Sequence, residues 1–276
     1  MTTAVMAPLY ERDLELGRNF VEKYNDYYDG LNLFLVFSDQ SEVDNFKCHN
    51  NYQYFVCTEK LDVSKKPISQ KKIFGVREIF KTTDFSNVMV VDIDSLPCAS
   101  VNHDECANYN IDRKKIYASP STNHSIINKV GRDCANRFFS PQDVQKLEQI
   151  TKGFTLYFWF NDIPIYERKH FLPFLEYINY SKIMDRLLYT TFDYIIYVFY
   201  LLIKDEIEIE EIDHTVVTDQ GSFLETQALQ DPTRFDAFFQ MAKPMWIKEP
   251  INEGSMERVW MRLHVNRRSR VGSLLY

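Results

Sequence analysis

The segment from residue 88 to residue 97 constrains the fold of this chain more than any other. Four apolar residues, Val88-Met89-Val90-Val91, run directly into Asp92-Ile93-Asp94, and Ser95-Leu96-Pro97 follow. An unbroken run of this kind indicates a buried strand, which is typical of parallel sheets. Ligands of open α/β sheets bind at the carboxyl ends of such strands. The segment therefore predicts an α/β fold with two carboxylates at its ligand-binding edge.

The spacing of the two carboxylates suggests what they bind. Aspartates one residue apart at a strand end supply hard oxygen ligands for Mg²⁺ or Mn²⁺, ions that also bind phosphate oxygens. Asp92 and Asp94 are therefore candidate metal ligands, and the metal would neutralise charge on a diphosphate leaving group. A solvated strand end is the alternative, because neighbouring acidic residues are common.

The first hundred residues alternate expected strands with expected helices, which favours βαβ units. Strands are predicted at 3–10 with a break at Pro8, at 32–37, 54–57 and 88–91; helices at 14–24 and 71–80, with helix and loop over 43–54. In the rest of the chain we expect a polar loop or lid over 98–113 and strands at 115–118 and 153–160. Helices are expected at 140–149, 167–178 and 219–229, with one or two mostly buried helices over 183–203. An acidic solvated surface is expected over 204–211, and extended or irregular chain over 244–266. No repeat or low-complexity linker marks a domain boundary, so a single domain is predicted.

Composition excludes several classes of protein. The chain has 276 residues, is 45% hydrophobic and carries a formal net charge of −7, which favours a real core and argues against general nucleic-acid binding. Its five cysteines form no C-x-x-C pair, so a cytoplasmic protein without a disulfide framework or zinc site is expected. The longest apolar run, 194–203, is too short to span a bilayer, and charges at 11–13 come too early for a signal peptide.

Four segments, taken in order, resemble one family. They are Met6-Ala7-Pro8-Leu9-Tyr10, the helix from Gln70 leading into Asp92-Ile93-Asp94, the stretch 157–165 before a helix, and Thr218-Asp219-Gln220-Gly221. Together they resemble the GT-A glycosyltransferases, closest to the glycogenin-like and bacterial lipooligosaccharide galactosyltransferase branch. In the third segment Asp162 and Ile163 replace the Ser and Gly that are usual in that family, and the Gly and Lys-Pro-Trp expected after His264 are missing.

The resemblance implies a fold and an activity. It implies one Rossmann-like domain with a mixed central sheet flanked by helices, a nucleotide-binding half (1–100) and a helical or irregular acceptor-binding half (101–276). It also implies metal-dependent sugar transfer from a nucleoside diphosphate, UDP being favoured, to a glycan or lipid-linked glycan. Mn²⁺ or Mg²⁺ would be the cofactor.

The implied site residues fall into three groups. Pro8, Tyr10 and Asp39 would contact the base or ribose, and Lys72 and Arg77 the diphosphate. Asp92, Asp94 and His264 would bind the metal. Asp162, Asp219 and Gln220 would lie beside the sugar, where a carboxylate serves as general base if the enzyme inverts. In a retaining enzyme, which the resemblance favours, the leaving phosphate takes that proton.

Each assignment has a plainer alternative. Lys71 and Lys72 also fit a solvated helix end, Asp39 a surface turn, and Asp219 a helix cap. The basic cluster of Arg262, Arg267, Arg268 and Arg270 fits diphosphate contact, peripheral attachment to an anionic membrane that carries a lipid-linked acceptor, or a solvated tail.

Three other functions compete with sugar transfer. A haloacid-dehalogenase-type phosphatase would use Asp92 as nucleophile and Asp94 as acid/base, but the motif lies deep in the chain and no later acidic pair for its metal is evident. A sugar nucleotidyltransferase would need a glycine-rich loop after the first strand, and residues 7–12 contain no glycine. In a non-enzymatic binding module the two aspartates would be structural.

Overall fold

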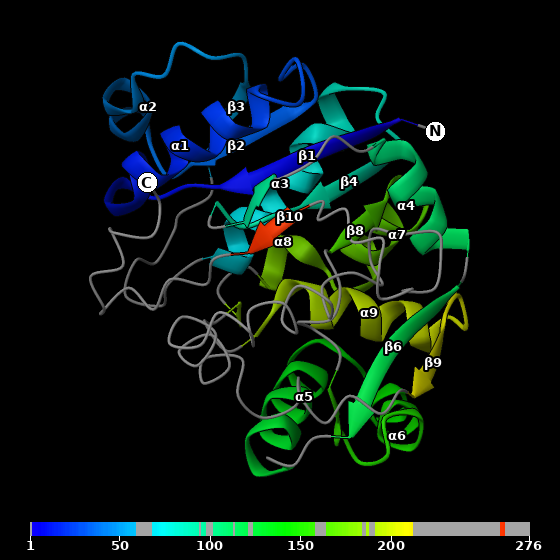
Figure 1. The fold of residues 1–276 in the computed structure, drawn as a ribbon. Coiled ribbons are helices and arrows are strands. Elements are labelled where there is room, and N and C mark those ends of the chain that lie inside the picture. The colour runs from blue at the N-terminus through cyan, green and yellow to red at the C-terminus, as the bar shows by residue number, and fades with distance from the viewer. Residues whose placement is uncertain are drawn as a thin grey trace, which may run out of the picture.

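A mixed five-stranded sheet forms the centre of the molecule. The computed structural model describes residues 2–58, 68–93, 95–97, 102–112, 114–120, 124–157, 164–183, 186–187, 191–211 and 260–262. The sheet contains β1 (Thr3–Pro8), β2 (Leu33–Phe37), β3 (Gln53–Val56), β4 (Asn87–Val90) and β8 (Ile165–Glu167), in the order β3-β2-β1-β4-β8 (Figure 1). The first four strands are parallel, and β8 runs antiparallel to β4 at the edge. The predicted α/β class is confirmed.

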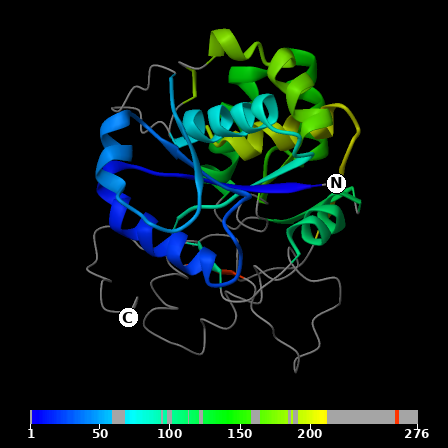
Figure 2. The same cartoon turned by 90° about the horizontal axis from the view of Figure 1, so that it is seen from above.

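Helices cover both faces of this sheet. One face packs against α1 (Leu14–Asn25), α2 (Gln40–Phe46) and α4 (His103–Asp112), and the other against α3 (Ile68–Thr82), α7 (Arg168–Tyr177) and α9 (Asp193–Ile203) (Figure 2). Because side chains alternate along a strand, Val5 of β1 belongs to the first core and its neighbour Met6 to the second. Strands β1, β2 and β4 are buried on both faces, as their apolar runs predict, whereas edge strand β3 is partly exposed.

The remaining elements extend the second core or lie beside the sheet. Helices α5 (His124–Phe138) and α6 (Pro141–Ile150) pack on α9, and short segments η1 (Glu11–Asp13) and α8 (Tyr180–Ile183) follow β1 and α7. A second sheet has the order β7 (Leu156–Tyr157), β6 (Lys115–Pro120), β9 (Glu208–Glu211). A two-stranded ladder pairs β5 (Ser95–Pro97) with β10 (Trp260–Arg262), so that Arg262 lies opposite Ser95.

Several predicted segments differ from the structure. The loop expected over 98–113 is wrong for 103–112, which form α4 and bury His103, Cys106 and Ala107. The acidic stretch 204–211 lies at the surface, as expected, but its residues 208–211 also form β9, a strand that was not predicted and that pairs with β6 in parallel. Helix α5 had no counterpart in the prediction. Of the strand expected at 153–160, residues 153–155 form a turn and only 156–157 are β, and residues 158–160 lie outside the described part.

Among the described residues, no helix is long and apolar enough to cross a membrane. The run 194–203 forms most of α9, which is buried from Ile195 to Ile203. It is a core helix, as its length predicts.

Candidate functional site

The carboxyl edge of the parallel strands gathers most of the predicted nucleotide-site residues that the structure describes. Strands β1, β2 and β4 are parallel neighbours or share a neighbour, so they end at the same edge. Tyr10 follows β1, Asp39 follows β2 and Asp92 follows β4. The first two turns of α3 return to this edge, because Lys71 contacts Leu9 and Ser38, which follow β1 and β2. The edge therefore brings two acidic side chains, one aromatic side chain and one cationic side chain together.

Asp92 and Lys72 form a partly exposed ion pair in this site. Lys72 Nζ lies 2.8 Å from Asp92 Oδ1, and the side chains are 14% and 31% exposed. A charge-assisted contact of this length is strong for its kind, although solvent screens it in part. The pair places a carboxylate and an ammonium side by side, the two charges that a metal-bound diphosphate requires.

Tyr10 and Pro8 lie at the end of β1. Pro8 is the last residue of the strand and is buried in register with Val36. Lys71 Nζ lies 3.9 Å from the centroid of the Tyr10 ring, and the guanidinium carbon of Arg12 lies 5.7 Å from it. Two cations therefore lie against the π-system of Tyr10.

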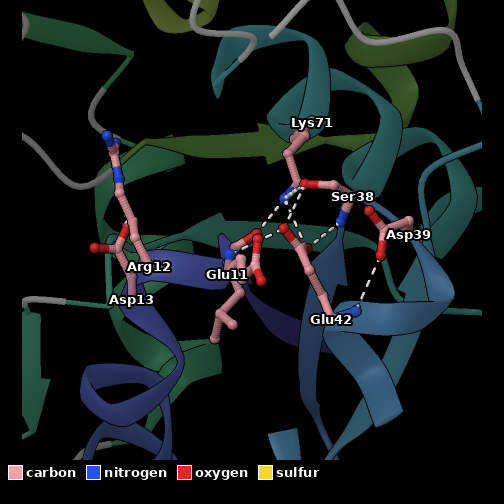
Figure 3. A network of polar contacts seen from close by, with 8 residues as sticks. Glu11, Arg12, Asp13, Ser38, Asp39, Glu42 and Lys71 are labelled. Carbon is pink, nitrogen blue, oxygen red and sulfur yellow. Dashed lines mark hydrogen bonds and ion pairs between the residues drawn. The ribbon is translucent and has the colours of Figure 1, made fainter. Parts of the chain in front are cut away.

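Lys71, for which a solvated helix end was the plainer interpretation of the sequence, is fully buried. Its ammonium donates to the carbonyl of Leu9 and to Ser38 Oγ at 2.9 Å, and lies 3.7 Å from Glu42 Oε2 (Figure 3). Burial lowers the pKa of Lys71 to about 8, although the Glu42 carboxylate opposes the shift. The solvated alternative is wrong for this lysine.

Glu42 completes the same network. Its carboxylate accepts hydrogen bonds from the backbone N–H of Ser38, from Ser38 Oγ at 2.9 Å and from the backbone N–H of Glu11 at 2.9 Å. Asp39 lies beside it but is exposed, and its Oδ1 accepts from Glu42 N at 3.0 Å. Asp39 is thus the N-cap of α2, a structural role that explains its residue type.

Arg77 does not lie at this edge. It follows Lys72 by five residues, about 7.5 Å further along the helix axis. Its Nε contacts Glu78 Oε1 at 2.8 Å, and its guanidinium carbon lies 4.8 Å from the ring centroid of Tyr180. The structure brings Lys72 to Asp92, whereas it places Arg77 against α8.

A buried carboxyl lies behind the pair. Asp193, at the start of α9, is 5% exposed. Its carboxylate accepts a hydrogen bond from Tyr166 Oη, and its backbone N–H donates to Ser69 Oγ at 3.3 Å. Burial raises the pKa of Asp193 above its usual value, and the nearby charge of Lys72 opposes the rise. Lys72 therefore lies in the field of two carboxyls, one exposed and one buried.

Five predicted site residues lie outside the described part of the chain: Asp94, Asp162, Asp219, Gln220 and His264. Within the described ranges, no group of three or more His, Cys, Asp or Glu side chains is placed to hold a metal ion. Of the three predicted metal ligands, the structure describes Asp92.

Sequence reasoning missed Glu42, Asp193 and the burial of Lys71. Asp39-Gln40-Ser41-Glu42 after a strong strand matches the D-x-x-E spacing of a capping box, in which a glutamate turns back to the helix start. That spacing was the available signal for Glu42. No local pattern distinguishes a lysine that is buried from its exposed neighbour, so Lys71 and Lys72 look alike in sequence.

A separate cavity of about 180 Å³ lies at the other end of the sheet. Its lining includes Glu167, His170 and Tyr197, and Glu167 pairs in register with Asn87, the first residue of β4. Glu167 contacts Lys169 Nζ at 2.8 Å, so its charge is already compensated. This cavity is distinct from the edge that carries Asp92.

Comparison with known proteins gives a distant structural similarity. No protein-family model and no curated protein sequence matches the chain. Among solved structures, it is similar to the apo structure of WbbM, a bifunctional glycosyltransferase, with a TM-score of 0.41 and 9% sequence identity over 76% of this chain. The match covers 38% of that structure, so the chain spans well under half of its length. A similarity this distant assigns no role to any residue of the candidate site.

Proposed function

We propose that the protein is a metal-dependent glycosyltransferase that moves a sugar from a nucleoside diphosphate, with UDP as the expected nucleotide, to a glycan or lipid-linked glycan. The observation that carries the proposal is the Asp92–Lys72 pair at the carboxyl end of β4, beside the ends of β1 and β2. In open α/β sheets this is the edge at which ligands bind. The motif order described above supplies the reaction class.

The residues divide the work according to their chemistry. Asp92 would ligate the cation, and Lys72 would exchange its contact with Asp92 for one with the diphosphate, since an ammonium binds either oxygen anion. Tyr10 would offer its ring to the nucleoside. Asp162, Asp219 and Gln220 remain proposals for the sugar and acceptor side. Within this proposal, Lys72 holds the diphosphate as the glycosidic bond breaks.

Among the described residues, Asp92 is the candidate ligand whose chemistry fits a divalent cation. Asp92 is partly exposed and supplies hard oxygen, and Asp94 follows two residues later. The pairing of Arg262 with Ser95 supports His264 as the third ligand, because two residues of chain reach at most about 7 Å from Arg262. When bound, the cation would act as a Lewis acid on the diphosphate.

Hydrolysis of nucleotide sugars without acceptor tests this proposal. With Mn²⁺ present, slow release of sugar is expected from a UDP-sugar in a screen of UDP-, GDP- and TDP-hexoses. Asp92→Asn and Asp94→Ala are each expected to keep the fold and to reduce the rate about a hundredfold or more, because they remove metal ligands. Undiminished hydrolysis in both variants would remove the metal from the mechanism.

Asp205→Asn is the matched control. Asp205 forms an ion pair with Lys146 at the same 2.8 Å distance, but it is 78% exposed and lies in the turn after α9. Its replacement is expected to leave the rate unchanged. Rapid turnover of a generic phosphate ester by the wild type, lost in Asp92→Asn, would instead favour the phosphatase alternative.

A further inference from the structure

A buried ion pair joins the two turns that begin the candidate site. The turn after β1 contributes the carbonyl of Leu9 and the N–H of Glu11, and the turn after β2 contributes the N–H and hydroxyl of Ser38. Lys71 and Glu42 contact both turns, and Figure 3 shows their charged groups directed toward each other between them.

The pair is occupied with protein groups. An ammonium has three donors, and Lys71 directs them at Leu9 O, Ser38 Oγ and Glu42. The Glu42 carboxylate accepts three hydrogen bonds and the ion pair. Because both side chains are buried and engaged, neither is available to contact a ligand. Their effect on a ligand must pass through the residues that they hold.

We propose that Lys71 and Glu42 are positioning residues that fix the β1 and β2 turns relative to each other, so that Tyr10 is presented to the nucleoside of the donor. This inference rests on the proposed function and adds to it a device that orders the nucleoside side of the site in advance. The Lys71 ammonium lies 3.9 Å from the centroid of the Tyr10 ring, and this cation–π contact holds the ring. A site ordered before binding loses less entropy when the ligand arrives.

The charge of Lys71 makes the device sensitive to pH. The charged and titratable groups that face Lys71 are Glu42 and Asp39 from the β2 side, Tyr10 from the β1 side and Cys57 beyond β3. With a pKa of about 8, Lys71 keeps its proton at pH 7 and loses it at pH 9.5. Deprotonation removes the ion pair with Glu42, so the turns are expected to separate more readily above pH 8.

Binding of UDP with Mn²⁺ across pH 7 to 9.5 tests the proposal. Wild-type affinity for UDP is expected to fall about tenfold with a midpoint near pH 8. Above that pH the turns are not ordered in advance, so the entropy lost in ordering them opposes binding. Lys71→Met alone leaves a buried, unpaired carboxylate and risks misfolding. The double variant Lys71→Met/Glu42→Gln removes both charges and is expected to bind UDP about tenfold more weakly at pH 7, with no step near pH 8. Lys72→Met is expected to weaken binding yet retain that step.

Amide hydrogen exchange at constant pH gives a second readout that needs no ligand. The N–H groups of Glu11 and Ser38 donate to Glu42, so both are expected to lose protection together in the double variant. Wild-type protection in the double variant, or its wild-type affinity with an unchanged pH step, would overturn the positioning role. If the wild type binds no UDP, the proposed function fails and the presentation of Tyr10 to a nucleoside fails with it. Concerted loss of protection would then still identify the pair as the connection between the turns.

Discussion

At the scale of the residue, two adjacent lysines in α3 have different environments. Lys72 is partly exposed and pairs with Asp92, whereas Lys71 is fully buried and pairs with Glu42. Successive residues of a helix are rotated by about 100°. Lys71 therefore points to the ends of β1 and β2, whereas Lys72 points to the end of β4. The sequence predicts Lys72 and Asp92 as site residues because their types suit the chemistry of a metal-bound diphosphate. It did not identify Lys71, because burial of this lysine depends on Glu42, Ser38 and Leu9, which lie far from it in the sequence.

Asp39 allows its capping role to be separated from any role in binding. Asp39→Ala removes the acceptor for Glu42 N and is expected to lower the free energy of unfolding by about 1 kcal/mol. Asp39→Asn is expected to retain nearly all of it, because asparagine caps helices as well as aspartate does. Urea denaturation of the three proteins measures the difference. Equal destabilisation by Ala and Asn would contradict a role as a neutral hydrogen-bond acceptor.

At the scale of the element, periodicity predicted those segments whose apolar pattern is strong. Strand β4 and helices α3, α7 and α9 were predicted because their apolar residues repeat at strand or helix spacing over several turns. Helix α4 was missed because most of its residues are polar, and the buried residues among its described side chains are His103, Cys106 and Ala107. Strand β9 was missed because its glutamates correctly indicated a solvated surface but did not distinguish a surface strand from a loop. Its pairing with β6 includes an ion pair of Glu210 with Lys115 at 2.9 Å. Tertiary pairing decided both elements.

Helix α3 is held against the sheet by a close approach at Gly75. A Cβ at this position would lie 2.5 Å from Val36 Cγ2, and the stiff valine side chain of β2 cannot move aside freely. Gly75→Val is therefore expected to lower the free energy of unfolding by about 1–3 kcal/mol through overpacking. Thermal or urea denaturation measures this change.

Lys81→Ala on the same helix serves as its control. Lys81 is 55% exposed and contacts Glu78 at 3.5 Å, so its loss is expected to have little effect. A Gly75→Val variant as stable as Lys81→Ala would show that α3 can move away from β2 without cost, and that the lysines it carries are not fixed by this contact.

At the scale of the whole molecule, the fold brings distant segments to one edge of one sheet. Residues 8–10, 38–42, 71–72 and 92 meet there because four strands are parallel, which the apolar runs predicted. The pairing of β10 with β5 was not predictable from spacing, since it joins residues 95–97 to residues 260–262. The candidate site was therefore predictable where it follows strand ends and not where it depends on long-range contacts.

Buried tyrosines are expected to limit the stability of the whole molecule at high pH. Burial raises the pKa of Tyr24, Tyr166 and Tyr197 above the ordinary value. These groups stay protonated in the folded state while they ionise in the unfolded chain above about pH 10, so their contribution to stability is lost as the pH rises further. In urea denaturation at pH 8, 10 and 11, Tyr197→Phe is expected to show a shallower loss than the wild type. Phenolate formation by every tyrosine before unfolding would contradict their burial.

Calorimetric titration of the wild type with UDP, in the presence and absence of Mn²⁺, tests the central claim most directly. The claim is that the edge beside β4 binds a diphosphate through a cation held by Asp92. The predicted result is binding of UDP that requires Mn²⁺ and is lost in Asp92→Asn but retained in Asp205→Asn. Binding of UDP that is equally tight without metal, or unchanged in Asp92→Asn, would contradict it.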